Sequence, residues 1–353
     1  MPHSFGDLFA RLGSFEHLYD SYLAARRGKR DRPEVREFDC QLEHNLLGLQ
    51  SELVSGRWQP GRCHNFYVHE HKKRLITAAP FRDRVVHHAL VRVLEPCFEP
   101  TFISDSYACR AGKGQHRAID RFQGWLRGSR YVLRADIRKF YPSVDHELLS
   151  GLIARRIRDP RVLDLVRVIL RSGEGILDSE CEPVWFPGDD RFTPGARRRG
   201  LPIGNLTSQF LGNVYLNELD HFVKEALCRS RYLRYMDDFV VLSDRRSELR
   251  DGRARIADFL SRLRLVLNPA ETRVWRTTDG VEFLGFRVFP HYRLVRKATA
   301  LGYARKLGRL ARSVDRSAIR DSLQAWFSHT RHAASHRLNR LILDHAGLLA
   351  DGA

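Results

Sequence analysis

The segment from Arg231 to Asp244, RYLRYMDDFVVLSD, places two adjacent carboxylates, Asp237 and Asp238, inside an apolar run. The residues on both sides are mostly aromatic or aliphatic and favour β-strands, whereas Asp is depleted in strand interiors. Two apolar arms around a two-residue acidic tip predict a β-hairpin. Adjacent carboxylates repel each other, and a half-buried one costs free energy unless it is paired or bound to a cation. The hairpin is therefore either a cation site or an ordinary surface turn.

The charge of the chain narrows the kinds of partner it can have. Its 353 residues include 60 Lys and Arg against 42 Asp and Glu, a formal net charge of +18. This excess indicates a polyanionic partner, either nucleic acid or an anionic membrane surface. We find neither an apolar run of about 18 residues nor a basic N-terminal segment followed by an apolar core, so no transmembrane helix or secretory signal is expected. Nucleic acid is the favoured partner, and no membrane association is predicted.

The cysteines indicate a reducing compartment. None of the six forms a C-x-x-C pair, and no His pair completes a zinc pattern. Scattered thiols are typical of cytoplasmic proteins, so a cytoplasmic location is predicted.

Hydrophobic spacing and breakers predict the main elements. Helices are expected on both sides of Pro33, and strands between Cys63 and Leu75. The run DRVVHHALVRVLEPCFEP predicts a helix ended by Pro96. A long helix is expected after GLPIGN, two strands around VEFLGFRVFP, and a basic helical tail from Arg296.

A third acid, Asp136, closes the apolar strand YVLRADI well upstream of the hairpin. Acids on two adjacent strands could bridge a pair of Mg²⁺ ions and, through them, a triphosphate. Basic residues could then meet the remaining phosphate charge, although each of them taken singly also fits a solvated surface position. The candidates are Lys72, Lys73, Arg74, Arg82 and Arg110.

Six blocks of the sequence, in order, resemble those of a reverse transcriptase. KRLITAAPFRDRVVHHAL and FISDSYACRAGKGQHRAI resemble the two fingers blocks, and YVLRADIRKFYPSVDH resembles motif A. GLPIGNLTSQFLGNVYLNELD resembles motif B, RYMDDFVVLSD motif C, and VEFLGFRVF the primer-grip hairpin. The resemblance implies an α+β right-hand polymerase fold with fingers, an antiparallel-sheet palm and a helical thumb. The implied parts are an N-terminal helical extension over 1–60, fingers over 61–130, a palm over 131–295 with a loop insertion at 172–199 and the primer-grip hairpin at 281–290, and a thumb over 296–353.

The same resemblance implies roles for individual residues. Asp136 and Asp237 would be the principal ligands of two Mg²⁺ ions, for which Mn²⁺ is a possible substitute, with Asp238 as the third catalytic acid. Ile137 would lend its backbone carbonyl to a metal. Tyr141 would be a steric gate that blocks a nucleotide's 2′-hydroxyl; a core aromatic residue fits the same place. The implied nucleotide-binding residues are Lys73, Arg74, Arg82, Arg110, Tyr141, Ile203, Gly204 and Gln209, and the implied primer grip is Phe283, Leu284 and Gly285.

Motif B suggests a subgroup. Ile203 stands where Gln is usual and Gln209 where Pro is usual, and the form LPIGNLTSQ resembles reverse transcriptases of diversity-generating retroelements. Ile has no hydrogen-bonding group, so a mispair at the nucleotide should be penalised less. The resemblance implies adenine-mutagenic, error-prone cDNA synthesis from a template repeat RNA, for targeted diversification of a variable gene. Its implied partners are template RNA, a cDNA or DNA primer, dNTPs and a small basic accessory protein.

Other interpretations remain open. The chain could be a faithful reverse transcriptase of a group II intron or of an antiphage defence system, with Ile203 as a packing variant. It could also be a nucleic-acid-binding protein with a decayed site, or a membrane-surface protein. Relatives often carry Lys where Ala270 and Glu271 stand, so no catalytic role is predicted in that segment. A bacterial, archaeal or phage origin is expected.

Overall fold

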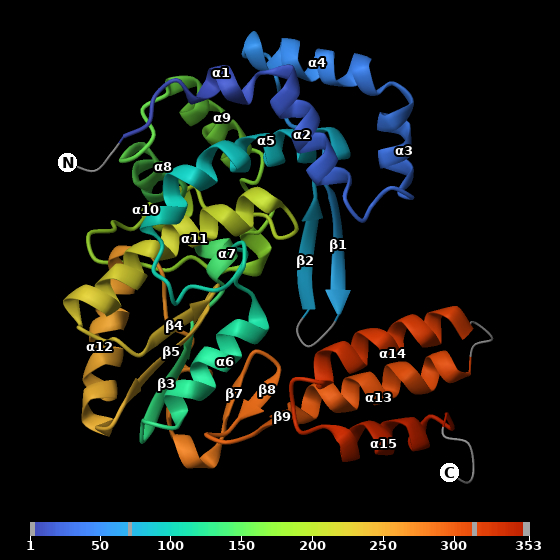
Figure 1. The fold of residues 1–353 in the computed structure, drawn as a ribbon. Helices are drawn as coiled ribbons and strands as arrows, with labels where there is room; N and C mark the ends of the chain where they lie inside the picture. The colour runs from blue at the N-terminus through green and yellow to red at the C-terminus, as the bar shows by residue number, and fades with distance from the viewer. Residues whose placement is uncertain (1–3, 70–72, 313–315, 349–353) are drawn as a thin grey trace.

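The computed structural model describes residues 4–69, 73–312 and 316–348 (Figure 1). In these residues the chain forms three antiparallel sheets and a larger number of helices. Lys72, a predicted phosphate contact, lies outside the described residues. The α-helices are α1 Leu8–Leu12, α2 Phe15–Arg26, α3 Pro33–Cys40, α4 Leu42–Val54, α5 Phe81–Phe98, α6 Gln115–Leu126, α7 Phe140–Ser143, α8 His146–Ala154, α9 Pro160–Arg171, α10 Thr193–Ala196, α11 Leu206–His221, α12 Arg246–Arg262, α13 Lys297–Ala311, α14 Arg316–Thr330 and α15 His336–His345. The strands are β1 His64–His69, β2 Lys73–Ala78, β3 Tyr131–Asp136, β4 Tyr232–Tyr235, β5 Asp238–Ser243, β6 Arg273–Arg276, β7 Val281–Phe283, β8 Phe286–Val288 and β9 Arg293–Val295.

The central sheet has the strand order β4-β5-β3-β6, and all its neighbouring strands are antiparallel. The acidic hairpin is present as β4 and β5, but its tip differs from the prediction. The connecting turn is Met236–Asp237, and Asp238 is already the first residue of β5, where it pairs with Tyr235. Met236 adopts a left-handed φ of 53°, which closes the turn one residue earlier than the doubled acid suggests.

Both faces of β3 and β5 are covered, which explains why most of their residues are apolar, whereas the edge strand β6 is largely exposed. Leu133, Phe239 and Val241 face a core built with α5, α8, α9 and α11. Val132 and Val240 face a second core built with α6 and the β7–β9 sheet. Because successive side chains of a strand point to opposite faces, an uninterrupted apolar run is what two-sided burial requires.

Helix α5 continues through Pro96 to Phe98, so the predicted stop at Pro96 is wrong. A proline inside a helix removes one backbone donor and its ring crowds the preceding turn, so other contacts must offset this cost. Cys97 and Phe98 are both buried, and their packing keeps the final turn helical.

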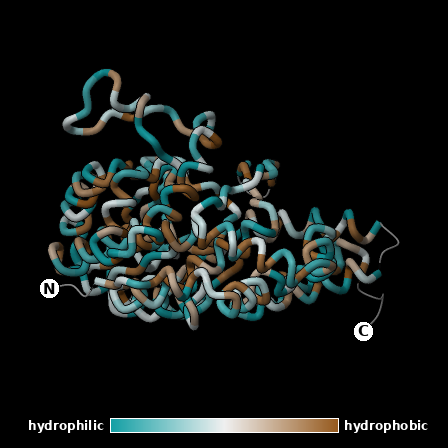
Figure 2. Tube along the Cα trace, turned by 90° about the horizontal axis from the view of Figure 1, so that it is seen from above, coloured by the Kyte–Doolittle hydropathy of each residue, from teal (hydrophilic) through white to brown (hydrophobic). Residues whose placement is uncertain are grey.

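The C-terminal part holds two features that bear on the site. The two predicted strands β7 and β8 form a sheet with a third, β9, whose three residues gave no sequence signal. Helices α13, α14 and α15 extend to one side of the main body, and Figure 2 shows hydrophobic residues gathered inside that body. The predicted loop insertion, 172–199, is not entirely irregular. It carries a 3₁₀ turn, Asp178–Glu180, and the four-residue helix α10.

Candidate active site

Strand pairing brings three carboxylates together. Asp136, the last residue of β3, is directly opposite Asp238, the first residue of β5. Glu271, which precedes β6, joins them, so that ligand oxygens of the three residues lie within 4.8 Å of one another. Asn268 fixes Asp136 through its backbone N–H, 2.8 Å from the Asp136 carbonyl, and its Nδ2, 3.0 Å from Oδ2. In the part of the chain that the structure describes, this is the one cluster of at least three potential metal-binding side chains.

A guanidinium lies among these acids. Arg134, two residues before Asp136 on β3, places Nη2 3.4 Å from Asp238 Oδ1 and 3.3 Å from Glu271 Oε2. Carboxylate oxygens are the ligands that hard divalent cations prefer. The donor set therefore fits a divalent cation.

Asp237 occupies the turn beside this cluster and is half-buried. Burial, and then the charges of Asp136 and Asp238, raise its pKa from 3.8 to about 7, against a smaller opposing effect of Arg74. A carboxyl that resists ionisation for these reasons is stabilised as a carboxylate by a bound cation. The backbone N–H of Ile137, the residue predicted to lend a carbonyl, donates to the Asp237 carbonyl at 3.2 Å.

Tyr141, the predicted steric gate, is near the same carboxylate. Burial raises the pKa of the Tyr141 hydroxyl, and the charge of Asp237 adds to this effect. Its ring packs close to α11, where a Cβ added at Gly212 would stand 3.9 Å from Tyr141 Cε1. Gln209, one turn earlier on α11, accepts a hydrogen bond from Cys109 Sγ at 3.4 Å.

The predicted basic residues divide into those on strand β2, Lys73 and Arg74, and those paired with glutamates, Arg82 and Arg110. Arg74 on β2 acts electrostatically on both Asp237 and Tyr141, and the ammonium of Lys73 lies 3.9 Å above the ring of Tyr67. Arg82, in contrast, forms an ion pair with a glutamate of α4, Glu52.

Arg110 is likewise engaged away from the carboxylates. Its largely buried guanidinium binds Glu99, with 2.6 Å between Nη2 and Oε1, and donates to the carbonyls of Ile103 and Ser106. Arg82 and Arg110 are thus each bound to a glutamate in this structure, and their contact with a triphosphate stays a prediction.

The motif B loop is anchored to strand β2 through its backbone. The Ile203 carbonyl accepts from the Thr77 N–H at 2.7 Å. Gly204 has a φ of 120°, and a Cβ there would lie 3.0 Å from Ile76 Cγ2 and 3.2 Å from the Thr77 carbonyl oxygen. Only glycine combines that conformation with so close an approach.

The predicted primer-grip residues form the turn between β7 and β8. Phe283 is buried, whereas Leu284 and Gly285 have φ values of 47° and 83°. Gln115 of α6 donates to the Leu284 carbonyl at 2.6 Å, and an added Cβ at Gly285 would lie 3.8 Å from the ring of His329. The turn thus touches both α6 and α14.

The paired acids on an antiparallel sheet, the left-handed turn and the glycine-anchored loop define a nucleic-acid polymerase class, and comparison with known proteins agrees. The sequence matches the family described as Reverse transcriptase (RNA-dependent DNA polymerase) over residues 66–288. The chain therefore belongs to the reverse transcriptase family, and its enzymatic class is RNA-directed DNA polymerase. Polymerases of this family use template RNA, nucleotide substrates and divalent metals.

Relatives come from bacteria and organelles. Protein YkfC of Escherichia coli (strain K12) is 27% identical over 310 residues, which cover 75% of this chain and 75% of the relative. Group II intron-encoded protein LtrA of Lactococcus lactis subsp. cremoris is 25% identical over 213 residues, or 60% of this chain and 33% of LtrA. Nuclear intron maturase 1, mitochondrial, of Arabidopsis thaliana is 26% identical over 182 residues, which cover 41% of this chain and 26% of the maturase. This chain thus spans most of YkfC but a third or less of the two intron proteins.

Within the described ranges, no helix combines the length and the apolar character that crossing a membrane requires.

Proposed function

We propose that this reverse transcriptase makes error-prone, adenine-mutagenic cDNA from a template repeat RNA, for the diversification of a variable gene. The observation that carries the proposal is the motif B sequence LPIGNLTSQ, in which Ile203 replaces the usual Gln. An apolar side chain beside the incoming nucleotide makes no hydrogen bond that depends on the geometry of the base pair, so mispairs are penalised less.

The surroundings of Ile203 support a role at the nucleotide. Its carbonyl is bound to Thr77, three residues after Arg74 on the same strand, and Arg74 acts on Asp237. On the other side, Gln209 lies in the first turn of α11, whose Gly212 approaches Tyr141. Residue 203 is therefore tied, through its backbone, to the strand that also supplies a cation to the acidic site.

In the proposed chemistry, Asp136, Asp237 and Asp238 would hold two Mg²⁺ ions. Metal ions held there would supply activation of a primer 3′-hydroxyl and neutralisation of the triphosphate charge. The protein's own residues then position the reactants: Arg74 faces the phosphate charge, and Tyr141 closes the sugar side of the pocket. Positioning and charge neutralisation account for most of the catalysis in phosphoryl transfer.

The proposed architecture is that of a right hand. The fingers comprise 61–130, the palm 131–295 and the thumb 296–353, with 1–60 as an N-terminal extension. The cluster around β3 and β5 would lie in the palm, the β7–β8 turn would support the primer, and α13–α15 would hold the duplex. The net charge of +18 suits RNA and cDNA. A small basic accessory protein is part of this proposal.

The test is sequencing of cDNA made by the purified chain from a primed RNA, with Mg²⁺ and dNTPs. We expect errors concentrated opposite template adenines, and we expect Ile203→Gln to reduce them at least about tenfold. Ile203→Val, which keeps an apolar side chain, is the matched control and should retain the error pattern. Errors spread evenly over the four template bases would contradict the proposal.

The second candidate is a faithful reverse transcriptase of a group II intron or an antiphage defence system. The similarity to LtrA, a group II intron-encoded protein, favours it. In that case the wild-type chain copies adenines as accurately as other bases, and Ile203→Gln leaves the error rate unchanged.

A further inference from the structure

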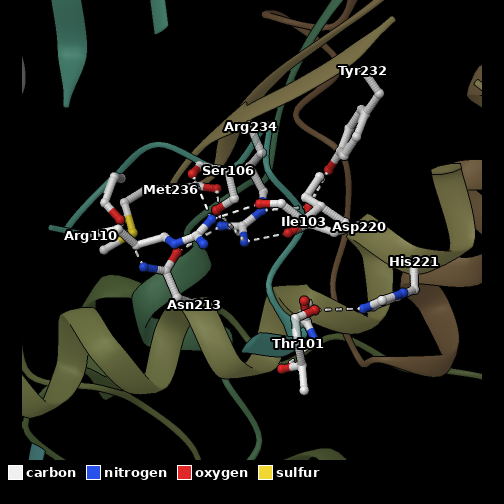
Figure 3. Close-up of polar contacts among 12 residues, drawn as sticks. Thr101, Ile103, Ser106, Arg110, Asn213, Asp220, His221, Tyr232, Arg234 and Met236 are labelled. Atoms are coloured by element: carbon white, nitrogen blue, oxygen red, sulfur yellow. Dashed lines mark hydrogen bonds and ion pairs between the residues drawn. The ribbon is translucent and has the colours of Figure 1, made fainter. Parts of the chain in front are cut away.

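Arg234 lies at the centre of a fully buried polar cluster next to the Met236–Asp237 turn (Figure 3). Its side chain and that of Asp220, on α11, are both 0% exposed. The guanidinium binds both oxygens of this carboxylate, with Nε 2.7 Å from Oδ1 and Nη2 2.6 Å from Oδ2. The Tyr232 hydroxyl donates to the same carboxylate at 2.7 Å. A buried ion pair thus joins β4 to α11.

The remaining N–H groups of Arg234 reach three other residues, one on α11 and two in other segments. Nη1 donates to Asn213 Oδ1 at 3.0 Å and to the Met236 carbonyl at 3.2 Å, and Nη2 donates to Ser106 Oγ at 3.2 Å. An arginine has five N–H donors in a rigid fork, and here all five have an acceptor. A lysine has three donors and cannot satisfy these four residues together.

The contact with Met236 is the one that reaches the acidic site. Met236 has a left-handed φ of 53°, which a residue with a side chain adopts only at a cost in free energy. Arg234 holds the carbonyl of this residue, and Ile137 N–H holds the carbonyl of Asp237 from the other side. The turn that presents Asp237 is therefore fixed at both of its residues.

Stability alone gives a weak reason for such an ion pair. Removing two charges from water costs several kcal/mol per ion, and well-packed apolar residues of similar volume are often equally stabilising or better. An arrangement in which one side chain connects a catalytic turn, a helix and the segment around Ser106 is better explained by precise placement of that turn.

We propose that Arg234 is a positioning residue for cation binding: its guanidinium fixes the Met236 carbonyl and so holds the Asp237 carboxylate beside Asp136. This inference rests on the proposed cation site of Asp136, Asp237 and Asp238. Loss of the guanidinium weakens divalent-cation binding and slows nucleotide addition, while the affinity for primer–template is unchanged.

The test uses the full-length chain with Arg234→Met and Asp220→Asn combined. The double substitution removes both charges, so no buried charge is left unpaired, and the Asn still accepts the Tyr232 hydrogen bond. The matched control is Arg197→Met with Asp189→Asn, which removes another buried ion pair, 2.5 Å long, in segment 172–199. Mn²⁺ binding is measured without nucleic acid by the paramagnetic resonance signal of free Mn²⁺, and folding by circular dichroism.

We expect the Arg234 double variant to bind Mn²⁺ at least about tenfold more weakly, as is common when a group that orients a metal ligand is lost. Its kcat should fall and be partly restored at high Mn²⁺, with the Kd for primer–template within twofold of wild type. The control should bind Mn²⁺ like wild type. A folded double variant with wild-type Mn²⁺ affinity would overturn the proposal.

Two further variants keep the result decisive. If the double variant does not fold, Arg234→Lys retains the buried ion pair but not the five-donor fork, and wild-type Mn²⁺ affinity in this variant overturns the proposal. Asp237→Ala tests the cation site itself. Unchanged Mn²⁺ binding in Asp237→Ala removes the site assignment, whereas a loss there without a loss in the Arg234 variants removes only the role of Arg234.

Discussion

Asp136 and Asp238 are directly opposed residues on the antiparallel strands β3 and β5. Opposed side chains in such a pair point to the same face of the sheet, so the strand register alone brings together two carboxylates that are far apart in the chain. A one-residue slip would turn each strand's side chains to the other face. Because both faces bury apolar residues such as Leu133 and Val240, the register that places the acids is set by the packing of the cores.

Removal of the turn carboxylate should abolish DNA synthesis. We expect Asp237→Ala to lower kcat by at least about 10³-fold, because metal-assisted charge stabilisation contributes several kcal/mol to the transition state. Primer extension with a single dNTP measures it. Asp258→Ala, which removes an exposed acid of α12, is the control and should extend primers normally. Unaffected synthesis by Asp237→Ala would remove this residue from the metal site.

Truncation of Tyr141 should relax sugar selection. We expect Tyr141→Val to raise the use of ribonucleotides relative to deoxynucleotides by at least about tenfold, since a ring that blocks the 2′-hydroxyl acts through its volume. The ratio of kcat/KM values for dNTP and rNTP measures the change. Tyr141→Phe keeps the ring and should behave like wild type; equal ratios in all three proteins would show that Tyr141 is only a core aromatic residue.

Three histidines connect the C-terminal helices to α6. The His116 and His332 rings are stacked, with centroids 3.7 Å apart, and His329 lies 6.3 Å from His116. Burial lowers the pKa of each below 6.5, and the neighbouring histidines lower the pKa of His116 and His329 further. An unfolded or undocked chain then binds more protons than the docked one, so the contact is most stable above pH 6.5 and weakens as the pH falls below it.

Acidification should therefore loosen α14. Arg293 and Arg331 also lower the pKa of His332, while Asp120 opposes them, so an added positive charge here meets mainly repulsion. We expect hydrogen exchange in α14 to rise severalfold more between pH 7.5 and pH 5.5 than the intrinsic pH dependence predicts. The increase should shrink in His332→Gln but persist in His44→Gln, which changes an exposed histidine of α4. An equal response in both variants would contradict this prediction.

The motif B loop should not tolerate a side chain at Gly204. A Cβ there meets Ile76 and the Thr77 carbonyl, and a φ of 120° is strained for any other residue. We expect Gly204→Ala to lower the free energy of unfolding by about 2 kcal/mol, measured by urea denaturation. Gly48→Ala, in the exposed middle of α4 with nothing within 4 Å, should instead raise it by about 0.5–1 kcal/mol. A neutral effect at Gly204 would mean that the loop can detach from β2 without loss.

Elements with local signals could be predicted from the sequence. The hairpin around Asp237, the strand that ends at Asp136 and the long helix after Asn205 follow from apolar spacing and turn residues, and the order of the motifs predicted the family. The position of the hairpin tip was missed by one residue because a left-handed Met236 is not encoded in any local preference.

Which side chains contact one another could be seen only in the folded protein. Glu271 joins the acids because β6 pairs with β3, and Arg110 turns to Glu99 although its sequence neighbours suggested a phosphate contact. The sequence shows Arg234 only as one more residue of a strand. In the structure it binds the Met236 carbonyl, and its other partners come from α11 and from Ser106. Such contacts depend on strand register and on the packing of distant helices, and these are set by the burial of whole cores and not by the residues on either side.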